Sequence, residues 1–288
     1  MRFAQCLQGS RNTGDTAPFR GLTVVGYSSI TIQPGYHLFT ATFEDCAGGE
    51  YNLDNVVVLN EDGTKWDVKD AATVPVVITK MTTDGKGKYD SNQTYSYRHL
   101  WVPVPPPLGT DSGLGWYVGA TTTRTTGNIT LKNGEGLSIN NQLKVPIKLQ
   151  FSGAVTLTGR SFRVGPGYSL VGNLTPVDVN LNDVKILNAD GEVIDVKDAS
   201  TVPGIITKMT TDGKGKYDSN QTYSYRHLWV PVPPPLGTDS GLGWYVGATT
   251  TRIGNNITIA QGEAVSINNQ MNYDIIVEFP SPIKEETK

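Results

Sequence analysis

The sequence has little charge and few cysteines, and these shortages exclude several classes of protein. Charged residues make up 18% of the 288 positions, and the net charge is −3 with acidic and basic residues intermixed, so no basic surface indicates a nucleic-acid partner. No apolar run approaches roughly 20 residues, so membrane insertion is not expected. The two cysteines, Cys6 and Cys46, are too few for a zinc site of about four ligands. They form either a disulfide in an exported protein or two free thiols.

Catalytic signatures are also missing. No His-Glu-x-x-His, Gly-x-Ser-x-Gly or P-loop motif occurs, and only His37, His99 and His227 are present. His99 and His227 occupy the same position in two copies of a repeat. No nucleophile or carboxylate keeps a recognisable spacing from them, so we expect both to lie on a strand surface. The sequence therefore indicates a protein that is not an enzyme and that needs no cofactor.

An internal repeat dominates the chain. Residues 78–124 are identical to residues 206–252, a run of 47 at a constant offset of 128. The repeat continues upstream in weaker form, where Phe19–Tyr36 aligns with Phe151–Tyr168 at an offset of 132. The first copy therefore has four extra residues near Cys46. We expect an N-terminal tail (1–18), module 1 (19–150), module 2 (151–279) and a charged C-terminal tail (280–288).

Each module has the pattern of a β-sandwich. Short segments with period-2 alternation and many β-branched or aromatic residues, such as Ser29–Ile32 and Thr94–Tyr97, predict strands. Glycine-rich turns separate them at spacings near ten residues. We therefore expect an all-β protein made of two tandem, jelly-roll-like sandwich modules.

Calcium is the one metal that the sequence suggests. Asp84 and Asp90 flank a glycine turn, and Asp212 and Asp218 repeat them in the second copy. Calcium takes oxygen ligands from such loops, but lysines stand where an EF-hand would place acids. Asp-Gly is also a common hairpin turn.

Clustered aromatic residues are candidates for glycan binding. The copies share two tryptophans and an adjoining tyrosine: Trp101, Trp116 and Tyr117 in the first, and Trp229, Trp244 and Tyr245 in the second. Exposed rings could stack on sugars, and two sites in tandem would add avidity. Alternatively, the same rings fill the sandwich cores.

Several short motifs recur in the same order in both modules. A Pro-Gly-Tyr turn, an Ile-Thr-Lys-x-x-x-Asp-Gly segment and a Gly-Trp-Tyr strand are followed by Gly-Glu-Gly/Ala and Ser-Ile-Asn-Asn. This order resembles β-sandwich repeat modules of bacterial secreted and cell-surface proteins. The resemblance implies an extracellular setting without enzymatic activity, and it supplies no site residues. The first residues have no apolar run typical of a signal peptide, so we expect a mature or recombinant start.

The joint between the modules suggests self-assembly. The segment 145–157 runs from one module into the next without a linker, and the two chain ends repeat its halves. We expect subunits to stack head to tail into a homopolymeric fibre or surface layer, each copying this joint. The N-terminal tail could donate a strand to a neighbour. The candidate assembly residues are Arg2, Phe3, Cys6, Leu7, Tyr273, Ile275, Val277 and Phe279. The alternative function is a carbohydrate-binding adhesin.

Overall fold

The computed structural model describes most of the chain between residues 25 and 282. The described ranges are 25–43, 50–69, 73–83, 89–102, 110–127, 129–132, 134–155, 159–197, 200–211, 217–230 and 238–282. Their regular elements are antiparallel strands and two single-turn 3-10 helices, which confirms the expected all-β class. No helix in these ranges is long and apolar enough to cross a membrane.

Module 1 is a sandwich of a five-stranded and a three-stranded sheet. The larger sheet has the order β2-β9-β5-β6-β7, the smaller has the order β1-β10-β4, and β3 pairs with β8. The elements are β1 (Val25–Ile32), β2 (Gly35–Phe39), β3 (Tyr51–Asn52), η1 (Leu53–Asn55), β4 (Val57–Asn60), β5 (Val76–Thr83), β6 (Tyr89–Val102), β7 (Thr110–Val118), β8 (Thr130–Leu131), β9 (Leu137–Asn141) and β10 (Ile147–Ala154).

Module 2 repeats this arrangement. Its sheets have the orders β12-β19-β15-β16-β17 and β11-β20-β14, with β13 paired to β18. The elements are β11 (Arg160–Val164), β12 (Gly167–Gly172), β13 (Val179–Asn180), η2 (Leu181–Asp183), β14 (Lys185–Leu187), β15 (Gly204–Thr211), β16 (Tyr217–Val230), β17 (Thr238–Val246), β18 (Thr258–Ile259), β19 (Ala264–Asn269) and β20 (Ile275–Phe279).

Alternating side chains build a separate core in each module. In β10, Ile147, Leu149 and Phe151 are fully buried, while the residues between them are partly exposed. These side chains join rings from the larger sheet, including Trp116, in a core formed by module 1 alone. Module 2 has its own core. Each sheet therefore turns one face inward, as period-2 patterning requires.

The boundary between the modules lies later than the sequence suggested. Phe151, expected as the first residue of module 2, lies in β10 and in the core of module 1. β10 continues to Ala154, which pairs with Val25 of β1. Module 2 begins with β11 at Arg160. The boundary lies later because β10 pairs with β1 along its whole length, which keeps the end of β10 in the first sandwich.

The two modules contact each other through reciprocal turns. The turn before β19 docks on the outer edge of β2, where Phe39 bridges Glu263. The turn before β9 docks in the same way on β12, where Val171 bridges Glu135. The backbone N–H of Thr40 donates to Gly262 O at 2.9 Å, and that of Gly172 donates to Gly134 O at 2.9 Å. Each contact is the repeat-equivalent of the other, so the interface has pseudo-two-fold symmetry.

Residues at the centre of this interface contact their own equivalents, as happens only at a two-fold axis. Thr40 and Gly172 occupy the same position in the two modules, and a methyl group placed at Gly172 would lie 2.2 Å from Cβ of Thr40. Gly136 and Ala264 form a second such pair, with a corresponding distance of 3.0 Å. A two-fold contact is isologous and closed, because each partner uses the same surface.

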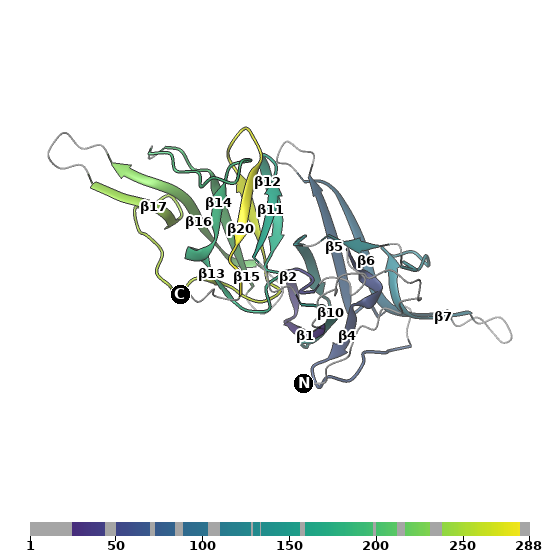
Figure 1. Cartoon of the computed structure of the whole chain (residues 1–288). Coiled ribbons are helices and arrows are strands. Elements are labelled where there is room, and N and C mark those ends of the chain that lie inside the picture. Colours follow the sequence, from purple (N-terminus) through teal and green to yellow (C-terminus); the bar gives the residue numbers. More distant parts are fainter. Residues whose placement is uncertain are drawn as a thin grey trace, which may run out of the picture.

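The identical 47-residue segment reaches away from this interface only in part, because its strands β5 and β15 contact β12 and β2 of the other module. It contains nearly all of β5 and the whole of β6 and β7, with their copies β15, β16 and β17. The β16–β17 pair extends on one side of the molecule and β7 on the other (Figure 1). The residues that follow the segment have diverged, since positions 125–150 match 253–278 at only 11 of 26 positions.

Candidate functional site

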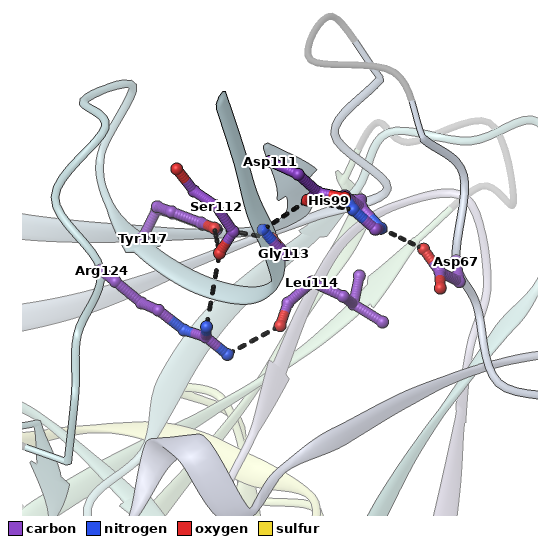
Figure 2. Close-up of polar contacts among 8 residues, drawn as sticks. All are labelled: Asp67, His99, Asp111, Ser112, Gly113, Leu114, Tyr117 and Arg124. Carbon is purple, nitrogen blue, oxygen red and sulfur yellow. Dashed lines mark hydrogen bonds and ion pairs between the residues drawn. The ribbon is translucent and has the colours of Figure 1, made fainter. Parts of the chain in front are cut away.

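The most distinctive polar site in each module is a buried histidine held between two aspartates. His99 lies on β6, one residue before a β-bulge between Leu100 and Trp101. Its Nδ1 is 2.5 Å from Oδ1 of Asp67, and its Nε2 is 2.8 Å from Oδ1 of Asp111 (Figure 2). The imidazole is 7% exposed, while the two aspartate side chains are 44% and 47% exposed. The ring is therefore enclosed, and its partners reach solvent.

Three separate segments bring these residues together. Asp67 follows Trp66, whose backbone N–H bonds to Val58 O of β4 and fixes the connection that leads to β5. Asp111 lies at the start of β7 and pairs in register with Trp101, just beyond the bulge. Since the bulge re-aims the strand, His99 and Asp111 meet although they lie 12 residues apart in the chain.

The geometry favours a charged imidazole. An ionised carboxylate only accepts hydrogen bonds, so both ring nitrogens must carry protons if His99 is to donate to both aspartates. The hydrogen bond to Asp67 is the largest influence that raises the pKa of His99 above its ordinary value; the bond to Asp111 adds to it, and burial opposes it. The bond from His99 is likewise the main cause that lowers the pKa of Asp111.

The same arrangement recurs in module 2. His227 lies 2.5 Å from Asp195 at Nδ1 and 2.7 Å from Asp239 at Nε2. Its hydrogen bond to Asp195 is the first cause of a raised pKa. We call the Asp67–His99–Asp111 group and its copy the histidine clamps.

A network of backbone contacts supports each clamp. Asp111 also accepts the N–H of Gly113 at 2.8 Å, where the positive φ of 77° suits glycine. The Tyr117 hydroxyl donates to Gly113 O at 2.6 Å, and Arg124 donates to Leu114 O at 2.8 Å (Figure 2). These contacts provide hydrogen-bond donors for carbonyls on the outer edge of β7. They also hold Asp111 in place within the β6–β7 hairpin.

The clamps correct the expectation of surface histidines. His99 is buried because Asp67 and Asp111 compensate its charge inside the fold. Both ring nitrogens are engaged, so the arrangement offers no free nitrogen for proton abstraction or metal ligation. Its chemistry is that of a structural clasp whose strength depends on protonation. The sequence did carry one usable signal, because both aspartates recur with the histidine in each copy.

Four of the predicted glycan-stacking rings are enclosed in the protein. Trp116 and Trp244 are 1% exposed, and Tyr117 and Tyr245 are fully buried. The Trp116 indole also donates to Val56 O at 3.1 Å, so its polar edge is used as well. The stacking role predicted for these four is wrong, since a sugar needs an open ring face. Trp229 is 41% exposed, and the side chain of Trp101 lies outside the described part of the chain.

Three of the predicted assembly residues are also enclosed. Ile275, Val277 and Phe279 are buried in β20, the central strand of its sheet, which pairs with β11 on one edge and β14 on the other. They cannot form an open half-joint, because both edges of the strand are taken. Tyr273, just before β20, is 41% exposed. Arg2, Phe3, Cys6 and Leu7 lie outside the described residues.

The remaining candidates lie wholly or partly outside the described structure. Asp84, Asp212 and Cys46 fall in undescribed segments, and for Asp90 and Asp218 only the backbone is described, in β6 and β16. Among the described residues, no group of three or more His, Cys, Asp or Glu side chains converges as a metal site. The calcium prediction therefore stays a prediction.

A groove in module 2 lies beside the aromatic cluster. It has a volume of about 560 Å³ and lies between η2, β17 and the segment after it. Asn182, Lys185, Arg252 and Asn255 supply its polar groups, and Trp244 contributes to the wall.

Comparison with known proteins gives no match. No family model, no curated protein and no solved structure is detectably similar to the chain.

Proposed function

We propose that this protein is an extracellular structural protein that assembles into a fibre or surface layer by adding a strand to one open sheet edge. The observation that carries the proposal is that most of the described sheet edges are capped or guarded by charged side chains, while the edge of β1 is not. An uncovered strand edge is a template for pairing with another chain, so proteins cap or guard the edges that must stay single.

The outer edges of β4 and β7 are capped from within module 1. Lys65 bridges Leu59 beside β4, and the Asn60 N–H donates to Thr64 O at 2.8 Å. Beside β7, the Val118 N–H donates to Thr123 O at 2.9 Å, and Arg124 bonds to the carbonyl of Leu114. The copies of these strands, β14 and β17, are capped in the same way. These edges are closed to strand addition.

The first strand of each module is treated differently. Within the described part of the chain, β1 and β11 each pair on one side only, with β10 and β20. β11 carries Arg160 and Arg163, and charged side chains guard an edge. β1 has the sequence VGYSSITI without any charge, and Tyr27 is 55% exposed. The eight-residue edge of β1 is thus the least protected one described.

The proposed occupant of this edge is the N-terminal segment of a neighbouring copy. Twenty-four residues precede β1, and at about 3.3 Å per extended residue they are long enough to reach another molecule. Within them, Arg2 to Leu7 has the short alternating pattern of a donated strand. Donation from chain to chain is a heterologous contact, and it propagates a fibre unless its rotation closes a ring.

The interface between the modules does not provide a template for head-to-tail stacking of chains. The interface between the modules is isologous, and both of its complementary surfaces are used within one chain. It therefore leaves no matching halves at the chain ends. Assembly through β1 does not need them.

Module 2 supplies the substitutions that test the proposal. Ser28 and Thr31 of β1 stand where β11 has Arg160 and Arg163. The variant S28R/T31R therefore gives β1 the two edge arginines of β11, a strand of the same fold that tolerates them. We expect wild-type protein to form filaments in negative-stain microscopy, and S28R/T31R to remain monomeric with an unchanged circular dichroism spectrum. Deleting residues 1–18 should also give folded monomers.

The matched control adds the same charge elsewhere. T122R/T250R places two arginines in exposed turns after β7 and β17, which lie in different sheets from β1, and should leave filaments intact. Wild-type protein that sediments as a monomer at high concentration contradicts the proposal, as do filaments of S28R/T31R.

The groove beside Trp244 favours glycan binding as a second candidate function. Its two amides and two cations could recognise hydroxyl and carboxylate groups of an acidic sugar. A glycan array probed with wild-type protein and N182A/N255A tests this. Binding that is lost in the variant supports an adhesin, and an empty array removes the candidate.

A further inference from the structure

We propose that the interface between the modules is a heterotypic pairing surface, on which module 1 fits module 2 and neither module fits a second copy of itself. The overall contact is symmetric, so homotypic pairs of modules would use the same backbone hydrogen bonds. The side chains on the pseudo-two-fold axis break this symmetry. This inference is independent of the proposed fibre.

Thr40 and Gly172 are the decisive pair. They face each other across the axis, and the position of Gly172 leaves no room for a side chain, since even a methyl group there would lie 2.2 Å from Cβ of Thr40. Real Cβ atoms do not approach below 3.0 Å. A pair made of two copies of module 1 would place Thr40 against Thr40 and is therefore sterically excluded.

Gly136 and Ala264 oppose the other homotypic pair. They face each other on the axis with the larger residue in module 2, the reverse of the first pair. A methyl group at Gly136 would lie 3.0 Å from Cβ of Ala264 and 2.7 Å from Cβ of Leu170. In a pair made of two copies of module 2, Ala264 would face Ala264 at this tight distance. Gly172 would face Gly172 and leave a gap between them. Each position thus matches a large residue with a small one only in the mixed pair.

Two peripheral contacts are compatible with every pairing. Gly134 accommodates Phe162, and Gly262 accommodates its counterpart Ile30, because glycine occupies both turns. The turns therefore set how the modules dock, and the residues on the pseudo-two-fold axis distinguish the mixed pair from the homotypic pairs. Using steric conflict against wrong partners is a recognised route to specificity.

The consequence is a chain that closes on itself. Only residues 155–159 separate β10 from β11, so the two modules meet at a high effective concentration within one chain. Homotypic contacts between chains, which would compete with this closure, are disfavoured at the axis. The same surface can still form between two chains when module 1 of one meets module 2 of the other.

The first experiment tests the steric pair. We expect G172A to separate the modules, which small-angle X-ray scattering detects as a larger radius of gyration. T40G/G172A should return to the wild-type value, because it exchanges the large and small residues. G165A is the matched control, since its added methyl group lies an ordinary 3.6 Å from Asp274.

The second experiment tests the choice of partner. G172A spoils the surface of module 2 and T40F that of module 1, so each variant alone has no compatible pair. Donor-labelled G172A mixed with acceptor-labelled T40F should show energy transfer, since module 1 of the first still fits module 2 of the second. Mixtures of G172A with itself should show none.

Specific results overturn the inference. A G172A protein with wild-type dimensions, or a double variant that stays open, removes the steric pair. Energy transfer between G172A chains at the level of the G172A/T40F mixture removes the heterotypic rule. If G172A alone is insoluble, recovery by T40G still decides the question.

Discussion

The histidine clamps make the stability of this protein depend on pH in a defined direction. We consider Asp67→Asn together with Asp195→Asn, which removes one negative charge from each clamp. An asparagine oxygen still accepts a hydrogen bond from Nδ1, so the geometry is kept while the ion pair is lost. The variant therefore isolates the electrostatic part of the clamp.

The size of the effect follows from exposure. The imidazole of His99 is buried, but the Asp67 side chain is 44% exposed, so solvent screens the pair. A screened ion pair contributes about 0.5–1 kcal/mol. The two clamps lie in different modules and should act additively, so the double variant should lose about 1–2 kcal/mol.

The sign of the pH dependence follows from the raised pKa of His99 and His227. A raised pKa in the folded state means that the stabilisation is complete below the ordinary histidine pKa of about 6.5, and that it is lost as pH rises through the folded value. The lowered pKa of Asp111 has the opposite effect on the acidic side. Its contribution to stability is lost as the pH falls below the ordinary pKa range of an aspartate.

Urea denaturation measured from pH 4 to pH 9 tests this reasoning. The wild type should lose stability on the alkaline side, and the double variant should be less stable near pH 5–6 but converge with the wild type at high pH. D190N, at an exposed turn residue that belongs to neither clamp, is the control. Parallel curves for the wild type and the double variant across this range would refute the charged clamp.

Three further predictions concern the cores and the strand edges. Trp116→Ala should cost about 3–5 kcal/mol of unfolding free energy, because a fully buried ring leaves a cavity; chemical denaturation measures this. Gly115→Ala should lower the melting temperature, since its methyl group would lie 2.8 Å from the Arg124 guanidinium and displace it from the edge of β7, whereas Gly165→Ala should not. Asn141→Ala should cost about 2–3 kcal/mol by the same denaturation assay, because the buried amide donates to two carbonyls, including that of Ile32.

The sequence predicted the strands well where alternation was regular. The alternation predicts strands at Ser29–Ile32 and Thr94–Tyr97, and these segments lie within β1 and β6. The end of the module was placed too early, because Phe151 fits the repeat pattern of both modules. Only its packing in the first core decides to which module it belongs.

The candidate site was predictable only in part. His99 was singled out, but its partners lie 32 residues before it and 12 residues after it. Such distances produce no local pattern, and they become contacts only through the pairing of β6 with β7 and the course of the chain after β4. The aromatic residues had the converse problem, since sequence cannot tell an exposed ring from a buried one.

By itself the sequence determined the duplication, the all-β class and the inward faces of the strands, because repeats and period-2 alternation are properties of neighbouring residues. The tertiary structure decided which edges are capped, which rings are enclosed and how the modules meet. Those features depend on residues brought together from distant strands or from both modules. The pseudo-two-fold contact between Thr40 and Gly172 is the clearest case, since neither residue has any meaning for the other until both modules are folded and face to face.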